Sequence, residues 1–168
     1  MPDTFNVALL ILRLAVGAVF LAHGIKHLRN RDKTMDWTES IGFSSPSIQW
    51  FFMSFAEIGV GASLLLGLFT SFGAAGLIAL MAVAFWTVHR KAGFWITARP
   101  DEGWEYVMIL AVAAWALALL GPGEWAIDHA LNIADDLDGG VGAILAAGGV
   151  AAAAGQLAVF HRSSRDPA

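Results

Sequence analysis

Two charged side chains interrupt long apolar stretches of the sequence. Arg13 lies about nine residues into the stretch at 5–27, and Glu57 lies about ten residues into the stretch at 48–69. A charge near the centre of a membrane helix costs about 2.5–3.5 kcal/mol on insertion scales unless it is paired or hydrated. We therefore expect Arg13 and Glu57 to contact each other, directly or through water. Two interpretations are open. Arg13 and Glu57 form an ion pair that only fixes helix register, or they form part of a site inside a helix bundle.

A second group of polar side chains lies where the apolar stretches begin or end. The first stretch ends with His23, Lys26 and His27. His89 closes the third stretch and Glu105 opens the fourth. Histidine titrates near neutral pH, and a neighbouring carboxylate shifts that titration, which suits proton transfer or hydrogen bonding to a quinone. The plainer reading is a set of interfacial histidines, with Glu105 placed at a helix start by the helix dipole.

These residues define the candidate site. The residues expected to transfer protons are Glu57, Glu105 and His23. The residues expected to bind a cofactor all carry groups that donate or accept hydrogen bonds: Arg13, Glu57, His23, Lys26 and His89. His23 and His89 also match the ligand pair of a bis-histidine haem. The chain has no haem attachment motif, so the expected cofactor is a quinone.

Composition excludes other redox groups. The chain has no cysteine, so it forms neither a disulfide nor a cysteine-ligated Fe–S cluster or zinc site. A group of acidic residues after residue 123 lacks the spacing of a calcium-binding loop. We expect these acids to be solvated: Asp128, Asp135, Asp136 and Asp138. No metal site is expected from the sequence.

The elements that position these residues are membrane-spanning helices. Of the 168 residues, 57% are hydrophobic and 14% are charged, which is outside the balance of soluble globular domains. A spanning helix needs about 20 apolar residues, and five stretches approach that length: 5–27, 48–69, 72–89, 104–121 and 140–160. The sequence therefore predicts an all-α, polytopic membrane helix bundle over residues 1–168, with a four-helix core and a fifth, Ala- and Gly-rich C-terminal helix.

Smaller features predict how these helices connect and pack. The turn at 68–73 makes the second and third helices antiparallel neighbours. The linker at 26–46 contains a short interfacial helix or re-entrant element. One stripe of the first helix, from Arg13 through Gly17 and Gly24 to His27, faces the bundle core. Small-residue ridges predict close helix packing on the second and fifth helices; they comprise Gly59, Ser63 and Gly67, and Gly148 with Ala152.

Charge indicates the orientation and the partners. Nine of the ten Lys and Arg residues follow the first, third or fifth stretch. By the positive-inside rule this places the N-terminus outside and the C-terminus in the cytoplasm. The net charge is −4, and the basic residues lie beside the apolar stretches, so a nucleic-acid partner is excluded. Membrane lipid is the expected partner.

The order and spacing of several residues resemble the DoxX family of small bacterial membrane proteins. The resemblance covers about residues 9–131 and depends on LRLAVGAVFLAHGIKHL, AEIGVGASLLLGLFTSFGA and EYVMILAVAAWALALLGPGEWAIDHAL. After Gly123, relatives commonly have Ser-x-Asp, whereas this chain keeps only the acid, Asp128. The resemblance implies a four-helix core in the bacterial plasma membrane, associated with redox complexes. Members are similar to the membrane subunit of thiosulfate:quinone oxidoreductase, and others are linked to oxidant defence.

Three functions are therefore open. The first is a redox subunit that binds a quinone, moves protons and receives electrons from a soluble enzyme at the cytoplasmic face. The second is a small-solute carrier in which Arg13 and Glu57 line an aqueous path; it would need oligomers or a very small substrate. The third is an assembly protein or anchor that recruits soluble enzymes of oxidant defence or sulfur metabolism through its basic loops.

Overall fold

The computed structural model describes residues 3–162, and helices are its main elements. The four longest helices are α1 (Asp3–Arg29), α3 (Pro46–Leu66), α4 (Thr70–Thr87) and α8 (Gly139–Phe160). The shorter elements are α2 (Arg31–Ser40), η1 (His89–Lys91), α5 (Glu105–Leu120), α6 (Ile127–Ala130) and α7 (Ala134–Leu137). The expected all-α class is confirmed, and α2 is a short helix in the linker where an interfacial helix or re-entrant element was expected.

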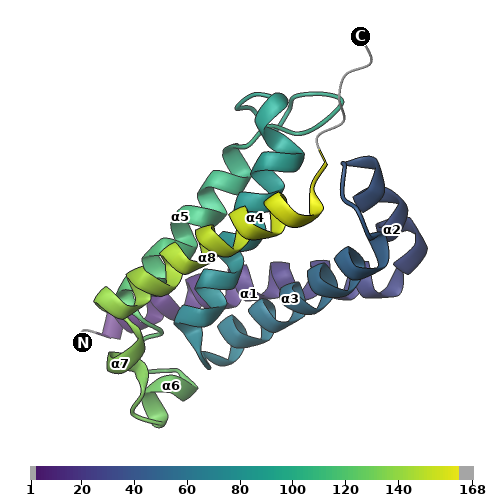
Figure 1. The fold of residues 1–168 in the computed structure, drawn as a ribbon. Helices are drawn as coiled ribbons and strands as arrows, with labels where there is room; N and C mark the ends of the chain where they lie inside the picture. Colours follow the sequence, from purple (N-terminus) through teal and green to yellow (C-terminus); the bar gives the residue numbers. More distant parts are fainter. Residues whose placement is uncertain (1–2, 163–168) are drawn as a thin grey trace.

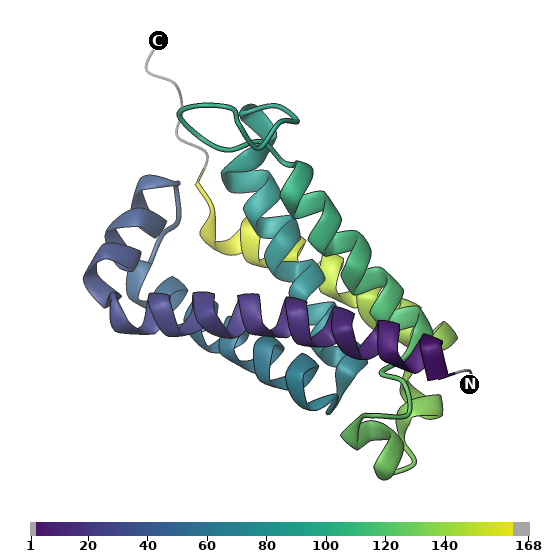
Figure 2. The ribbon, with the colours of Figure 1, turned by 180° about the vertical axis from the view of Figure 1, so that it is seen from behind.

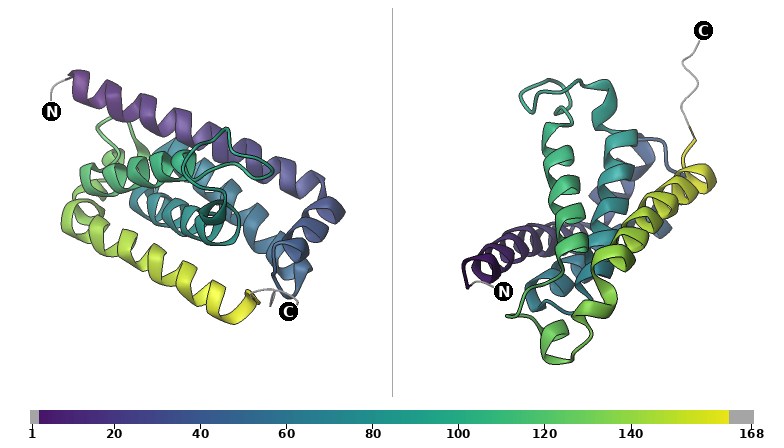
Figure 3. Two further views of the ribbon diagram at one scale, coloured as in Figure 1. Left: turned by 90° about the horizontal axis from the view of Figure 1, so that it is seen from above. Right: turned by 90° about the vertical axis from the view of Figure 1, so that its left-hand side faces the viewer.

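Four of the helices form two pairs that diverge from each other. Helices α1 and α3 run antiparallel, and α4 and α5 form a second antiparallel pair at a steep angle to the first (Figure 1). The view from behind shows α1 crossing in front of the other helices (Figure 2). Helices α3 and α4 are joined by the short turn expected from the sequence, but they diverge after it (Figure 3).

Helix α8 crosses the second pair and ends beside the first (Figures 1 and 3). At its start, α8 packs on α4 and α5. At its end, Gln156 donates a hydrogen bond of 2.9 Å to Gln49, in α3. The backbone N–H of Ser44, just before α3, donates a 2.8 Å bond to the carbonyl of Phe160. The fifth long apolar segment therefore connects the two helix pairs.

Close backbone contacts decide how the helices pack. Gly149 in α8 lies against the backbone of Ala75 in α4, whereas nothing would touch a Cβ atom on Gly148. The expected ridge at Gly148 and Ala152 is therefore displaced by one residue, to Gly149 and Ala153, which are buried. On α3, Gly61 is the residue that packs against α1, and Gly59 has open space beside it. Of the expected ridge on α3, Gly59 makes no helix contact, whereas Ser63 lies against Gly73 of α4 and Gly67 against Arg13 of α1.

Length and surface composition indicate membrane contact. Helices α1, α3, α4 and α8 are long and apolar enough to cross a membrane. Helix α5 is apolar but has 16 residues, about 24 Å at 1.5 Å per residue. Large apolar side chains are exposed on the outside of several helices, among them Ile11, Ile109 and Ile144. The chain is a multi-pass membrane protein whose helices contact lipid.

Candidate functional site

Arg13 and Glu57 lie at different levels of the α1–α3 pair. Arg13 is fully buried and donates hydrogen bonds to the carbonyls of Leu64, at 3.1 Å, and Trp125, at 2.7 Å. Leu64 is seven residues beyond Glu57, about 10 Å along a helix. Within residues 3–162 no ion pair joins Arg13 to Glu57, so the direct contact expected from the sequence is wrong.

Glycine contacts explain this register. Gly17 of α1 faces the backbone of Gly61 and Leu65, and Gly24 faces the backbone of Ser54 and Ile58. A Cβ atom on Gly24 would lie 2.8 Å from Ile58 N. The two helices approach closely at these glycines, and this alignment places Glu57 opposite the last turns of α1 rather than opposite Arg13.

The N-terminal half of α1 takes part in a structural cluster around Asp128. The Asp128 carboxylate is buried and accepts hydrogen bonds from the backbone N–H groups of Phe69, at 2.6 Å, and Thr70, at 2.8 Å. Its own N–H donates to the carbonyl of Gly67, at 2.8 Å. Arg13 and the Asp128 carboxylate also attract each other electrostatically. The expectation that Asp128 is solvated is wrong, because it caps the start of α4.

We call these residues the Arg13 cluster: Arg13, Leu64, Gly67, Trp125 and Asp128. The cluster joins three segments that are distant in sequence, namely α1, the α3–α4 turn and the loop after α5. Gly67 has φ +62°, and a Cβ there would meet the Arg13 guanidinium. The hydrogen bonds of the cluster hold these three segments together.

A second cluster lies toward the opposite end of α1 and consists of His23, His27 and Glu57. We call it the His–Glu cluster. The Nε2 atom of His27 lies 3.8 Å from Oε2 of Glu57, and the His23 and His27 ring centroids are 6.2 Å apart. One potential ligand atom from each residue lies within 4.8 Å of the other two. The side chains run from exposed His23 through half-buried His27 to buried Glu57.

Helix α2 fixes the orientation of His27. The Nδ1 atom of His27 lies 3.3 Å from Oγ1 of Thr34, and Trp37 stacks on the imidazole with an interplanar angle of 17°. Trp50, at the start of α3, donates a 3.0 Å hydrogen bond to the carbonyl of His27. With Nδ1 directed to Thr34, Nε2 is the nitrogen that faces Glu57.

Glu57 has an unused hydrogen-bonding atom. Glu57 is only 8% exposed, and its Oε2 is buried without a hydrogen-bond partner. Burying an unpaired polar atom costs about 1–3 kcal/mol by mutational data. Lys26 supplies a positive charge that acts on Glu57, His23 and His27. An unpaired acceptor of this kind is available to a ligand.

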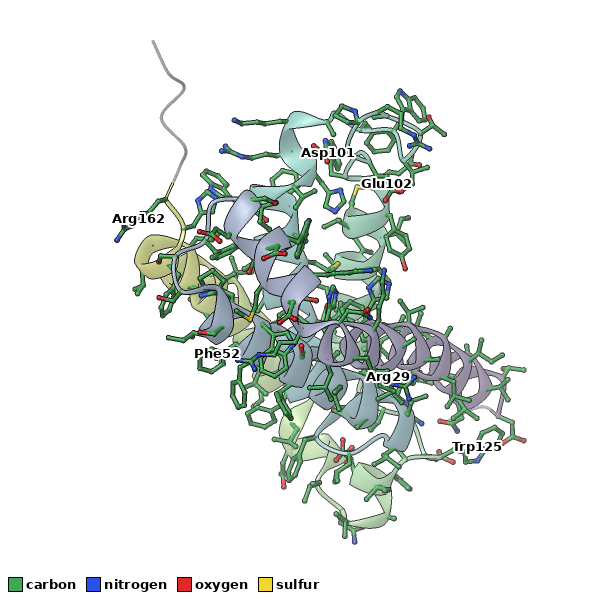
Figure 4. All side chains as sticks on the ribbon, turned by 90° about the vertical axis from the view of Figure 1, so that its right-hand side faces the viewer. Arg29, Phe52, Asp101, Glu102, Trp125 and Arg162 are labelled. Carbon is green, nitrogen blue, oxygen red and sulfur yellow. The ribbon has the colours of Figure 1, made fainter. Side chains whose placement is uncertain are left out.

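His89 and Glu105 lie elsewhere, at the loop that joins α4 and α5. His89 Nδ1 donates to the carbonyl of Glu102 at 2.6 Å, and Glu105 accepts a 3.0 Å hydrogen bond from the N–H of Ile96. Figure 4 shows Glu102 at the end of the α4–α5 pair, well away from Arg29 at the end of α1. The structure does not bring His89 to His23, and the Glu105 carboxylate holds the loop.

Of the residues expected at the site, the structure therefore assembles three: His23, Lys26 and Glu57. The list of expected site residues did not include His27, although the sequence placed it in the same polar group as His23 and on the core-facing stripe. Its signal is the four-residue spacing from His23, which places both imidazoles on one helix face. Thr34 and Trp37 were not predictable as its partners, because their contact requires α2 to fold back beside α1.

The comparisons with known proteins identify one family. A family model described as DoxX matches residues 8–90. This region contains the His–Glu cluster and part of the Arg13 cluster, whereas Trp125 and Asp128 lie beyond it. No curated protein and no solved structure matches the chain.

Proposed function

Residues 8–90 belong to the DoxX family, and from this premise we propose that the chain is the membrane subunit of a redox-associated complex. In this proposal a quinone head group binds at the His–Glu cluster, and a soluble redox enzyme is the electron donor. The observation that carries the proposal is the row of side chains from exposed His23 to buried Glu57, whose Oε2 lacks a partner.

The groups present fit a quinone head group. A quinone presents two carbonyl oxygens, which accept hydrogen bonds, and its reduction to the quinol consumes two electrons and two protons. Protonated Glu57 can donate a hydrogen bond from Oε2, and its carboxylate form can accept one from a hydroxyl. Lys26 places a positive charge beside the same atoms. The His23 imidazole is exposed, so it can exchange protons with water and with His27.

The proposal leaves out three residues expected from the sequence. Arg13 is bonded to two carbonyls inside the Arg13 cluster, and His89 and Glu105 hold the α4–α5 loop. The position of Arg13 also weakens the carrier hypothesis, because a fully buried guanidinium that donates to two protein carbonyls does not line an aqueous path.

The proposed orientation follows from basic residues beside the His–Glu cluster. Arg29 is the last residue of α1, Arg31 and Lys33 lie in the first turn of α2, and all three are exposed. The positive-inside rule places this end of α1 at the cytoplasmic face of a bacterial plasma membrane, with the N-terminus outside. A soluble electron donor would reach the cluster from that face.

The same exposed basic residues favour one alternative, a non-catalytic anchor that recruits soluble enzymes. Quinone binding distinguishes the two functions. The test is quenching of tryptophan fluorescence by a short-chain quinone added to the protein in nanodiscs, because Trp37 and Trp50 both contact His27.

Glu57→Gln tests the buried carboxyl, and Glu102→Gln is the matched control at the α4–α5 loop. A hydrogen bond to a charged group is worth about 1.5–3 kcal/mol, so we expect Glu57→Gln to weaken quinone binding by about 10- to 100-fold. The control should bind as the wild type does. Saturable quenching that is identical in all three proteins would contradict the quinone site and favour the anchor.

A further inference from the structure

We propose that the His–Glu cluster binds a divalent first-row transition-metal ion through His27 Nε2, one imidazole nitrogen of His23 and the carboxylate of Glu57. The proposal goes beyond the quinone site and does not depend on it. It also departs from the expectation drawn from the sequence, in which no metal site was foreseen. It stands on three observations: the separation of the three donor atoms, the fixed orientation of His27 and the unpaired oxygen of Glu57.

The separation of the donor atoms is close to that of a tetrahedral site. Metal–ligand bonds of about 2.0–2.2 Å place two ligands of a tetrahedral ion about 3.3–3.6 Å apart. His27 Nε2 and Glu57 Oε2 are 3.8 Å apart, and all three donor atoms lie within 4.8 Å of one another. Because His23 is exposed, a small rotation of its side chain brings the third donor to bonding distance.

The orientation of His27 is the one that a metal ligand requires. A metal-bound histidine usually donates its other ring N–H to a nearby acceptor, which fixes the tautomer and the ring plane. Here Thr34 Oγ1 lies 3.3 Å from His27 Nδ1, and Trp37 covers one face of the ring. These contacts direct the lone pair of Nε2 toward Glu57 before any ion binds.

The donor set indicates the class of ion. Two imidazole nitrogens and one carboxylate oxygen suit zinc, cobalt, nickel, copper or iron better than calcium or magnesium, which prefer oxygen ligands. Three protein ligands leave a fourth position open, as in zinc sites that bind water or a substrate. His23 is the exposed ligand of the three, so the site is reached from the surface of the helix bundle on that side. The nearby charge of Lys26 opposes the cation, so the expected affinity is below that of a closed structural site.

An ion at this position would use the lone pairs that the proposed function assigns to the quinone. Metal and quinone should therefore compete. Each is measured separately: the metal by its own spectrum and stoichiometry, the quinone by fluorescence quenching. A negative result in the metal assay therefore does not contradict the quinone site, and a negative result in the quinone assay does not contradict the metal site.

The experiment uses tag-free protein in nanodiscs that has been treated with a chelator and then titrated with Co²⁺ and with Zn²⁺. Visible absorption of Co²⁺ reports imidazole ligation in a site of low coordination number, and calorimetry gives the Zn²⁺ stoichiometry. We expect about one ion per chain. Glu57→Gln and His27→Gln should each weaken binding by at least about 100-fold, since each removes one of three ligands.

Two further variants separate ligation from folding and from adventitious binding. Thr34→Val keeps the shape of a buried side chain but removes the acceptor of His27 Nδ1, so we expect binding to weaken by about 10- to 100-fold with the metal-free melting temperature little changed. His129→Gln, outside the cluster, should bind the ion as the wild type does. Binding that is absent, or that is unaltered by Glu57→Gln, His27→Gln and Thr34→Val, would overturn the proposal.

Discussion

Replacing Gly24 with alanine should separate α1 from α3 at the level of the His–Glu cluster. A Cβ on Gly24 would lie 2.7 Å from Ile58 Cγ1, 2.8 Å from Ile58 N and 2.9 Å from Ser54 O. Ordinary contacts begin at 3.4 Å, so the helices must move apart by about 0.5–0.7 Å at this point. Two of the three atoms are backbone atoms, which cannot rotate away as a side chain does.

The expected cost is about 1–3 kcal/mol, which is typical of an overpacked interface. For a chain of this size each kcal/mol lowers the melting temperature by about 2–4 °C. The 3.8 Å separation of His27 and Glu57 should also increase, so affinity for quinone or metal should fall with stability. The assay is thermal unfolding followed by tryptophan fluorescence in one detergent, with ligand titrations on the same samples.

Gly59→Ala is the matched control on α3. Nothing lies within 4 Å of a Cβ on Gly59, so this substitution reports only the gain in helix propensity, about 0.5–1 kcal/mol. Gly24→Ala should therefore melt below the wild type, and Gly59→Ala at or above it. If Gly24→Ala were as stable as Gly59→Ala, the argument that glycine contacts set the α1–α3 register would be refuted.

Three further substitutions test other parts of the structure. Asp128→Asn should lower stability by about 1.5–3 kcal/mol because it weakens a charged helix cap, whereas exposed Asp135→Asn should not; equal melting temperatures would show that the cap is unimportant. Gly149→Ala should lower the melting temperature because its Cβ meets the backbone of α4, and Gly148→Ala should not. If Gly148→Ala were the less stable variant, the α8 contact would lie at Gly148, as expected from the sequence. Glu105→Gln should speed hydrogen exchange in the α4–α5 loop while leaving quinone and metal binding unchanged. Weaker binding of either ligand in this variant would show that Glu105 belongs to the binding site.

Much of the helical architecture follows from hydropathy. The long apolar stretches are helices, and their ends agree with the expected spans to within a few residues, as for α8 (Gly139–Phe160) against 140–160. The core-facing stripe of α1 was also predictable, because Arg13, Gly17 and Gly24 share one face at helical spacing and all are buried. These features depend on local periodicity, which a single sequence carries.

Register and long-range contacts were not predictable in the same way. Matching the midpoints of the two apolar stretches brings Arg13 near Glu57, whereas the glycine contacts shift α3 along α1 and bring Glu57 to His27. Asp128 was expected to be a solvated loop residue because its hydrogen-bond donors are distant in sequence. The N–H groups of Phe69 and Thr70 are 58 residues or more away. Such contacts appear only when separate segments are packed together.

Buried charged residues occur in both clusters, and they differ in how their polar atoms are paired. Arg13 and Asp128 are buried and charged, as residues of a binding site often are. Arg13 donates two hydrogen bonds to backbone carbonyls and leaves its Nε unpaired, and the Asp128 carboxylate accepts two hydrogen bonds from backbone N–H groups. Glu57 is buried with an oxygen that the protein leaves unpaired. The candidate site is identified by this unpaired oxygen together with the two imidazoles beside it, rather than by burial alone.

The most direct test of the proposed function is the quinone content of the protein as purified from its membrane. The protein is exchanged into nanodiscs and extracted into organic solvent, and quinone is counted by mass spectrometry for the wild type, Glu57→Gln and Glu102→Gln. The quinone site predicts close to one quinone per chain in the wild type and in Glu102→Gln, with a clear loss in Glu57→Gln. A stably folded wild type without quinone, or equal quinone content in all three proteins, would contradict it.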